Sequence, residues 1–349
     1  MTVEPGAPLQ AAVRKLAARE SLSREEAGSA FTAIMNCEGT SAQIAALLVG
    51  LRVKGETPAE IAGAAGALRE AMTVLDTREP SDLVDTCGTG GGTVMTFNIS
   101  TAAALLAAGA GVRVAKHGNR SFTSKCGSAD VIEALGVAVD LPVAQMGRVL
   151  ESAGIVFMFA PTMHPAMRHV GPVRREIAIP TLMNLIGPLA NPARAGRQVI
   201  GVADPARLEL IAQALQVLGT THSLVVHGEP GLDEVSPLGP TTVIELRGAG
   251  LTRWTLAPAA YGVKPARRED LAAGTPAENA TIIEEILGGR GAEGAVNAVL
   301  LNAAAAIYVS GRSPDFGAAL ASARAALTSG AGQAVLQRLR SAAPRSSTA

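Results

Sequence analysis

The chain has 349 residues, of which 48% are hydrophobic and 3% aromatic, and its 30 Lys and Arg residues balance 30 Asp and Glu residues. This length suggests about two domains with an aliphatic core, and the balanced charge argues against a general attraction to nucleic acid or anionic membranes. The three cysteines lack CxxC spacing, which predicts neither a disulfide framework nor a zinc site. No apolar signal segment or membrane-spanning run is visible. We therefore expect a cytoplasmic protein that binds neither nucleic acid nor membrane.

The first part of the chain, residues 1–76, is predicted to form a small helical domain. Ser23 and Glu26 make a capping-box pattern at the start of one helix, and Thr57 and Glu60 repeat it at the start of another. Between them, apolar residues recur at helical spacing in AQIAALLVGLRV.

From residue 83 onward, short β-rich runs alternate with helical stretches. The runs are LVDTCGT, VRVAKH, IVFMFAP, RQVIGVAD and SLVVHGE, and TTVIELRG with LTRWTLAP predicts an antiparallel hairpin. Such alternation is typical of the α/β class with a mostly parallel central sheet. We expect this larger α/β domain to occupy residues 77–162 and 193–349. Two helical pieces interrupt the alternation over residues 163–192, and we expect them to return to the small helical domain.

The stretch GTGGGTVMTFNIST, residues 88–101, contains four glycines in its first five positions. No Lys-Ser/Thr pair follows, so it is not a P-loop, and the dinucleotide fingerprint begins at Gly88 and Gly90 but ends on Thr93. A glycine turn before a helix start nevertheless exposes backbone N–H groups that bind anions. The pattern therefore favours a phosphate site over a turn that merely needs positive φ angles.

A second polar stretch, VAKHGNRSFTSKCGSAD, follows the next predicted strand. We expect one loop to hold Lys116, His117, Asn119, Arg120, Ser121, Thr123, Ser124 and Ser128. Two such loops on neighbouring strands indicate a ligand with phosphates at more than one point, because open α/β sheets bind ligands at the carboxyl ends of their strands.

Two further clusters of charged residues could belong to the same site. Asp233 and Glu234 in GLDEVSP suit Mg²⁺ beside a polyphosphate, and the alternative is a solvated turn. The segment HPAMRHVGPVRREI is predicted to carry its polar residues on one helical face. That face is either solvated or turns an Arg inward to grip a carboxylate. The residues concerned are His164, His169, Arg174 and Arg175.

Five motifs in this order resemble the anthranilate phosphoribosyltransferase family: KHGNR, GSAD, FAPTMHPAMRHVGPVRRE, NLIGPLANPA and GLDEVSPLGPT. The resemblance spans nearly the whole chain. It implies transfer of the 5-phosphoribosyl group from phosphoribosyl pyrophosphate (PRPP) to the amino group of anthranilate, which gives N-(5-phosphoribosyl)anthranilate and pyrophosphate in tryptophan biosynthesis. It also implies a Mg²⁺ cofactor and a homodimer joined through the helical domains.

The resemblance implies roles for individual residues as well. PRPP would be bound by Gly88, Gly91, Gly92, Thr96, Asn98, Ile99, Ser100, Thr101, Lys116, Ser124 and Ser128. Anthranilate would contact Gly88, His117, Asn119 and Arg174. Mg²⁺ would be held by Ser100, Asp233 and Glu234, and the catalytic residues would be Lys116, Asp233 and Glu234. The family loop usually reads Gly-Thr-Gly-Gly-Asp-Gly, whereas this chain has Gly92 and Thr93 at the last two positions, so the acid beside the pyrophosphate is missing.

Two alternatives stay open. Pyrimidine nucleoside phosphorylases share the architecture and use another acceptor, although KHGNR and the HPAMRH segment favour the anthranilate branch. A relative that has lost catalysis and binds nucleic acid would predict a basic surface and a damaged metal pair. The balanced charge and the presence of Asp233 and Glu234 count against that second alternative.

Overall fold

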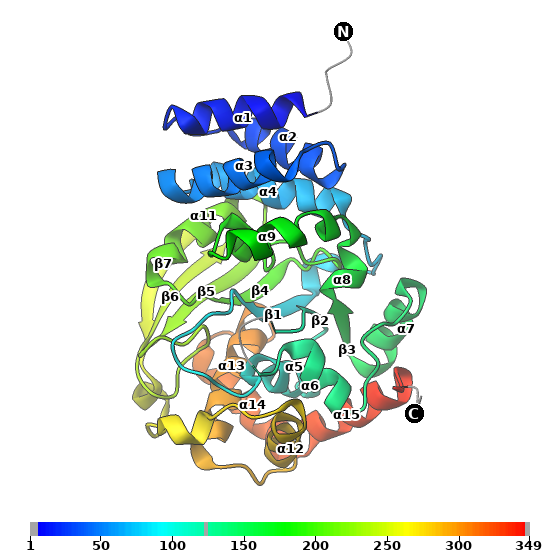
Figure 1. Ribbon diagram of the computed structural model, residues 1–349. Helices are drawn as coiled ribbons and strands as arrows, with labels where there is room; N and C mark the ends of the chain where they lie inside the picture. Colours follow the sequence, from blue (N-terminus) through cyan, green and yellow to red (C-terminus); the bar gives the residue numbers. More distant parts are fainter. Residues whose placement is uncertain (1–5, 122–124, 346–349) are drawn as a thin grey trace.

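The computed structural model describes residues 6–121 and 125–345, and its centre is a seven-stranded sheet (Figure 1). The strand order is β3-β2-β1-β4-β5-β6-β7, with β1 to β5 parallel and the β6–β7 hairpin antiparallel. This confirms the predicted α/β class and the mostly parallel sheet. The strands are β1 (Val84–Gly88), β2 (Val114–Gly118), β3 (Ile155–Phe159), β4 (Arg197–Gly201), β5 (His222–Gly228), β6 (Thr241–Arg247) and β7 (Gly250–Leu256).

Four N-terminal helices form a bundle above the sheet in Figure 1. They are α1 (Ala7–Ala17), α2 (Arg24–Met35), α3 (Ser41–Lys54) and α4 (Pro58–Ala71). Both predicted capping boxes form, because the side chain of each N-cap residue accepts a backbone N–H and the Glu three residues later reaches back. The helical character of the N-terminal part is therefore confirmed.

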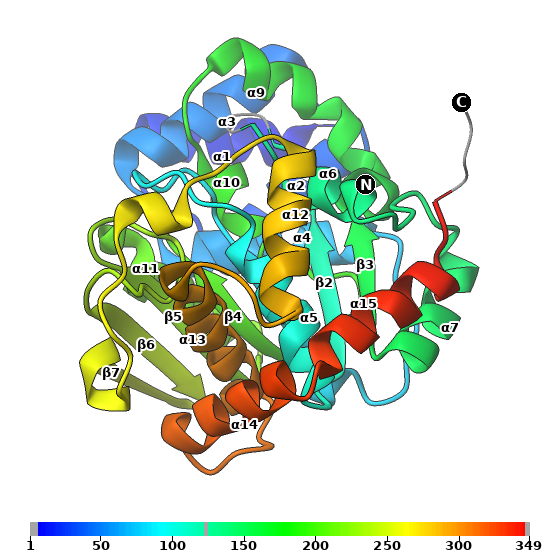
Figure 2. The same ribbon diagram turned by 90° about the horizontal axis from the view of Figure 1, so that it is seen from below.

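The remaining helices cover the sheet or connect its strands. Figure 2 shows α12 to α15 and α5 across the face of the sheet that lies away from the bundle. The α-helices are α5 (Ile99–Gly109), α6 (Ser128–Ala134), α7 (Val143–Ala153), α8 (Ala160–Met163), α9 (Gly171–Ile177), α10 (Leu182–Ile186), α11 (Leu208–Val217), α12 (Pro276–Leu287), α13 (Glu293–Val309), α14 (Phe316–Thr328) and α15 (Ala331–Ala342). Short 3₁₀ helices are η1 (Pro80–Asp82), η2 (Pro165–His169), η3 (Pro205–Arg207), η4 (Pro258–Tyr261) and η5 (Arg268–Leu271). No helix of the described residues is long and apolar enough to cross a membrane.

The sheet separates two hydrophobic cores, because successive side chains of a strand point to opposite faces. Val199 and Leu224 belong to the core built with α5 and α13. Their chain neighbours Ile200 and Val225 belong to the core built with α11 and the N-terminal helices. The carboxyl edge of the sheet therefore lies between two packed layers, which fixes the ends of its strands.

Residues 163–192 form three helical pieces instead of the two that the sequence predicts, because the segment HPAMRHVGPVRREI divides into two of them. They form η2, α9 and α10, because Pro165 and Pro172 each lie in the first turn of a new helix, where a missing N–H is tolerated. Val173 and Leu182 of this segment share one core with Leu47 of α3. The segment thus packs with the N-terminal helices although the sheet strands surround it in sequence.

Candidate active site

Two glycines at the carboxyl ends of neighbouring strands make room for the loop over residues 231–237. Gly88 of β1 and Gly201 of β4 are register partners. A Cβ atom on Gly88 would lie 2.6 Å from Asp233 Oδ2, and one on Gly201 would lie 1.6 Å from the Asp233 carbonyl O. The chain order of the sheet reverses between β1 and β4, which is where open α/β sheets bind ligands.

The adjacent carboxylates of that loop bind backbone N–H groups of two other elements. Asp233 Oδ2 accepts a hydrogen bond from Gly90 N at 3.0 Å, and Glu234 Oε1 accepts one from Ser100 N at 3.1 Å. The next residue, Val235, is bound at both its N–H and its C=O by the Asn302 side chain of α13, at 2.9 Å each. The acidic pair is therefore fixed between the glycine loop, α5 and α13.

The electrostatics of this pair fit a cation. Burial, followed by the charge of Asp233, raises the pKa of Glu234 to about 8, and burial raises the pKa of Asp233. Within residues 6–121 and 125–345, no three His, Cys, Asp or Glu side chains gather as a metal site. Mg²⁺ often takes only one or two protein carboxylates together with phosphate and water oxygens. The Asp233–Glu234 pair with the Ser100 hydroxyl therefore suits Mg²⁺.

Lys116 and His117 lie within β2 rather than in the loop after it, which corrects the sequence prediction. The strand continues to Gly118, and both side chains are buried, with 2% and 8% of their surface exposed. Period-two alternation sends Lys116 toward α5 and His117 to the opposite face of the sheet.

The ammonium group of Lys116 binds three oxygens at the start of α5 and the end of β1. Nζ donates to the Thr86 carbonyl O, and it lies 3.3 Å from both Thr86 Oγ1 and Ser100 Oγ. Burial lowers the pKa of Lys116, and nearby negative charges, first among them Asp85, act in the opposite direction. The Lys116 ammonium thus lies directly beside Ser100, and the backbone N–H of Ser100 donates to Glu234. A small cavity here is lined by Thr86, Ser100 and Glu234.

His117 pairs with His164, which follows α8. Their ring centroids are 5.0 Å apart with the planes tilted by 55°. Burial, together with the neighbouring His164, lowers the pKa of His117 to about 3, and burial lowers that of His164 to about 4. Both imidazoles are therefore neutral at physiological pH. Within the described residues, no hydrogen bond of good geometry reaches His117 Nε2 or either ring nitrogen of His164.

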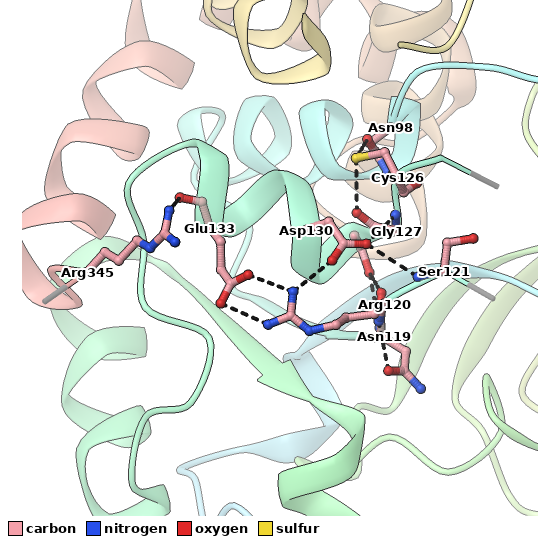
Figure 3. Close-up of polar contacts among 10 residues, drawn as sticks. Asn98, Asn119, Arg120, Ser121, Cys126, Gly127, Asp130, Glu133 and Arg345 are labelled. Atoms are coloured by element: carbon pink, nitrogen blue, oxygen red, sulfur yellow. Dashed lines mark hydrogen bonds and ion pairs between the residues drawn. The ribbon is translucent and has the colours of Figure 1, made fainter. Parts of the chain in front are cut away.

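The loop after β2 is organised by an ion-pair cluster on α6 (Figure 3). Arg120 binds Asp130 at 2.7 Å and binds both oxygens of Glu133 at 2.7 and 2.9 Å. Asp130 also accepts hydrogen bonds from Gly127 N at 2.8 Å and Ser121 N at 3.4 Å. The Arg120 guanidinium therefore stabilises the loop through ion pairs with α6 and is not free to bind a ligand.

Two predicted ligands in the same loop bind each other. Ser128 Oγ accepts a hydrogen bond from Asn119 N at 3.2 Å and donates one to the Asn119 carbonyl O at 3.3 Å. Asn119 Oδ1 accepts the Arg120 N–H at 2.8 Å. Ser124 and Thr123 lie outside the described residues.

The residues before and within the first turn of α5 are only partly accessible. Asn98 Oδ1 accepts a hydrogen bond from Asn279 of α12 at 3.0 Å, so the Asn98 side chain does not cap α5. Ile99 and Thr101 are buried, with 0% and 1% exposure, and Ile99 can offer only backbone groups. Thr96 forms an isolated bridge to the backbone after η5. Gly91 is exposed on the glycine loop with a φ of 83°, whereas Gly92 is partly buried against Asp233 and Gly231.

Arg174 lies on α9, which packs against α3. Burial lowers its pKa, and no carboxylate of the described residues lies within ion-pair distance. No hydrogen bond or ring contact links Arg174 with Asn119 or His117 in the described part of the chain. The structure thus brings together Gly88, Ser100, Lys116, Asp233 and Glu234, whereas Arg174 stands apart from that cluster.

Three residues around the cluster escaped the sequence analysis as site residues. Thr86 binds Lys116, and Asp85 and Asn191 bind each other at 2.8 Å. The signal that could have revealed Asp85 is a carboxylate inside a predicted strand.

Comparison with known proteins matches both parts of the chain to one family. Residues 10–72 match the helical bundle domain of the glycosyl transferase family, and residues 80–333 match its a/b domain. A curated anthranilate phosphoribosyltransferase of Roseiflexus sp. (strain RS-1) is 50% identical over 334 residues, which covers 95% of this chain and 97% of the relative. This chain belongs to the anthranilate phosphoribosyltransferase family. The resemblance drawn from the five sequence motifs and the predicted enzyme class are thereby confirmed.

Solved structures of the family agree with the fold. The anthranilate phosphoribosyltransferase of Thermus thermophilus has a TM-score of 0.90 and 44% identity, and the match covers 95% of this chain and 98% of that one. The Saccharomyces cerevisiae enzyme in complex with PRPP and Mg has a TM-score of 0.86 and 28% identity, with 96% and 98% covered. The yeast enzyme has also been solved in complex with 4-fluoroanthranilate, with a TM-score of 0.85, 27% identity, and 97% and 98% covered.

Proposed function

We propose that the chain transfers the phosphoribosyl group from PRPP to the amino group of anthranilate at the carboxyl edge of β1, β2 and β4. The observation that carries this proposal is that Lys116 and Glu234 both bind Ser100 at the start of α5, while the neighbouring Asp233 binds Gly90 of the glycine loop. The family relatives solved with PRPP and Mg and with an anthranilate analogue support these substrates over the acceptors of nucleoside phosphorylases.

The glycine loop, the start of α5 and the polar stretch over residues 116–128 would bind PRPP. Backbone N–H groups of the loop and of the α5 start suit its phosphates, because a helix N-terminus favours anions. The proposed PRPP ligands are Gly88, Gly91, Gly92, Thr96, Asn98, Ile99, Ser100, Thr101, Lys116, Ser124 and Ser128. For Ile99 and Thr101, burial limits the contribution to backbone groups.

Leaving-group departure would depend on charge stabilisation by Lys116. Its ammonium is already fixed by Thr86 and Ser100, so it need not reorganise as negative charge builds on pyrophosphate. Ser100, Asp233 and Glu234 would hold Mg²⁺, which when bound supplies positive charge that stabilises the same leaving group. The aniline nitrogen of anthranilate is nucleophilic without a strong base, so the neutral His117 need not accept its proton.

The acceptor would lie toward the helical segment on the bundle side of β2. His117 faces that side. Arg174 carries a half-buried guanidinium that has no carboxylate partner within residues 6–121 and 125–345, which suits the carboxylate of anthranilate. Gly88 and Asn119 complete the proposed acceptor contacts. Binding two reactants in fixed geometry can lower the barrier by about 7–11 kcal/mol in well-oriented systems.

Several finer statements stay predictions from the sequence. They are the division of the chain at residues 1–76, 77–162, 163–192 and 193–349, the homodimer through the helical domains, the absence of nucleic-acid binding and the cytoplasmic location. What supports the division is that residues 170–190 share a core with the N-terminal helices.

The test is to follow the fluorescence of anthranilate with PRPP and Mg²⁺, in the parent and in the double variant Asp233→Asn, Glu234→Gln. We expect Mg²⁺-dependent consumption by the parent and none by a folded double variant. A parent that consumes no anthranilate would contradict the function, and a double variant that keeps the parental rate would contradict the assignment of the metal ligands.

A further inference from the structure

The parallel strands β1 and β2 share fewer paired positions than the other neighbouring parallel strands of the sheet. They pair only at Val84 and Val114. By contrast, β1–β4, β2–β3 and β4–β5 each pair at five positions. The backbone hydrogen-bond ladder between β1 and β2 is therefore interrupted toward the edge where the candidate active site lies.

Side chains bind three of the four backbone groups that would continue the ladder by one rung. In a parallel ladder, the N–H of Thr86 would donate to the carbonyl of Ala115, and the N–H of His117 would donate to the carbonyl of Thr86. His117 N instead donates to Asp85 Oδ1 at 3.1 Å. The Thr86 carbonyl accepts from Lys116 Nζ. Backbone groups in a sheet interior need partners, so these side chains are what allows the strands to part.

The third backbone group of the rung is bound by Asn191. Its Nδ2 donates both to the Ala115 carbonyl at 2.9 Å and to Asp85 Oδ2 at 2.8 Å, and its Oδ1 accepts the N–H of Ala193 at 2.9 Å. Asp85 and Asn191 are 0% and 2% exposed. Asp85 accepts a hydrogen bond at each of its two oxygens, so an amide in its place would turn an NH₂ group toward one of the two donors.

We infer that Asp85 and Asn191 are positioning residues that hold β2 apart from β1 so that Lys116 reaches the Thr86 carbonyl and Ser100. The inference rests on the role of Lys116 under the proposed function. Neither Asp85 nor Asn191 is hydrogen-bonded to Lys116, whose side chain lies on the opposite face of β2. The charge of Asp85 also raises the pKa of Lys116 directly, so the variant Asn191→Ala, which keeps that charge, isolates the effect that passes through the backbone of β2. If the rung closed, the Thr86 carbonyl would face the N–H of His117 and Lys116 would lose that acceptor.

The experiment is a double-mutant cycle between Asp85→Asn and Lys116→Met, read as kcat and as KM for PRPP. Asp85→Asn alone should lower kcat about 10- to 100-fold, the range expected for misplacing a catalytic group. KM for PRPP should rise by a smaller factor than kcat falls, because Lys116 is proposed both to bind PRPP and to stabilise the leaving group, and the second interaction is stronger in the transition state. In the Lys116→Met background, Asp85→Asn should change kcat less than about twofold, because groups that act as a unit are not additive.

Glu245→Gln is the matched control. Glu245 is a largely buried carboxylate of the same sheet, bound to His222 at 2.8 Å and Tyr308 at 2.9 Å, and it pairs with Leu224 near the amino-terminal end of β5. This control should lower Tm and leave kcat within about twofold. If Asp85→Asn does not fold, Asn191→Ala keeps the charge of Asp85 and enters the same cycle.

Failure of the positioning role and failure of the proposed role of Lys116 give different results. An equal loss of kcat from the Asp85 or Asn191 change in both backgrounds, or a loss of Tm with parental kcat as in Glu245→Gln, would overturn the positioning role. Parental kcat in Lys116→Met would instead overturn the proposed role of Lys116, and the inference with it.

Discussion

Glu234 Oε1 accepts a hydrogen bond from the backbone N–H of Ser100 at 3.1 Å, so its carboxylate is held against the first turn of α5. Burial and the charge of Asp233 raise its pKa to about 8, well above the ordinary 4.5. An acid whose folded pKa exceeds its unfolded pKa contributes stability that is full below pH 4.5. That contribution is lost as the pH rises from 4.5 to about 8.

The first prediction is that Glu234→Gln raises the Tm of the metal-free protein at pH 8 by at least about 3 °C, because the raised pKa corresponds to several kcal/mol. A change of about 1 kcal/mol shifts Tm by roughly 2–4 °C in proteins of about 150–250 residues and by somewhat less in a larger chain. The gain should shrink toward pH 5, where Glu234 is already protonated. Thermal unfolding at the two pH values is the measurement, and Glu285→Gln, at an exposed position of α12, is the control. A gain that is equal at both pH values would exclude the raised pKa as its cause.

The second prediction concerns the missing acid of the glycine loop. A Cβ atom on Gly92 would lie 3.1 Å from Asp233 Oδ1, so Gly92→Asp would put a third carboxylate beside the metal pair. More anionic ligands favour binding of further Mg²⁺. We expect the parent to tolerate high Mg²⁺ better than Gly92→Asp does, measured as initial rates across a magnesium series at fixed PRPP.

Gly92→Asn is the control for this series, because it adds the same volume without the charge. Its magnesium profile should follow that of the parent. Superimposable profiles for parent and Gly92→Asp, or weaker inhibition of the Asp variant, would rule out the electrostatic explanation.

The third prediction is that Arg174→Ala weakens the use of anthranilate but not the binding of PRPP. Losing a charge-assisted hydrogen bond should cost about 1.5–3 kcal/mol in kcat/KM for anthranilate. Arg175→Ala removes the exposed neighbouring cation and should leave kcat/KM nearly unchanged. An equal loss of PRPP affinity in Arg174→Ala, measured by calorimetry, would contradict the assignment of Arg174 to anthranilate.

The fourth prediction follows from the neutral pair of His117 and His164. Their folded pKa values, about 3 and about 4, lie below the ordinary 6.5, so the stability that these groups contribute is full above pH 6.5 and is lost as the pH falls toward 4. Between pH 6.5 and pH 5, each buried imidazole should cost the folded state about 2 kcal/mol. We expect His164→Asn to lose about that much less stability than the parent over this range.

Urea unfolding at several pH values measures this difference. His169→Asn is the control, because His169 is only partly buried on η2 and its ring nitrogen accepts a hydrogen bond from Arg168. If His164→Asn and the parent lose stability in parallel, His164 is not held neutral by burial.

The sequence predicted the fold through local patterns. Strand and helix alternate at their natural spacing, so the parallel sheet and the β6–β7 hairpin could be recognised before any contact was known. The capping boxes at Ser23 and Thr57 involve residues three positions apart, and such short-range chemistry is visible in the sequence. The glycine loop was recognisable because only glycine permits close approach of the backbone.

The sequence could not predict how side chains meet across long separations. Asp85 and Asn191 are 106 residues apart, and nothing local to either indicates the other. The polar stretch around Lys116 predicts a loop, although the β-rich run VRVAKH already reaches this residue. The oxygens of Thr86 and Ser100 that compensate for its burial come from segments distant in the sequence. Arg120 looked like a phosphate ligand, and its ion pairs with Asp130 and Glu133 depend on how α6 folds back over the loop.

The crowding at Gly201 bears on how tolerance to substitution should be interpreted in this protein. Gly201 presents no group to a substrate, yet a methyl group there would occupy the position of the Asp233 carbonyl, at 1.6 Å. A saturation scan for activity would therefore score Gly201 as severely as Lys116, although one position supplies an ammonium and the other supplies empty space. A list of ligands based only on sensitivity to substitution would wrongly include Gly201. What Gly201 contributes is the space that it leaves for the loop with Asp233 and Glu234.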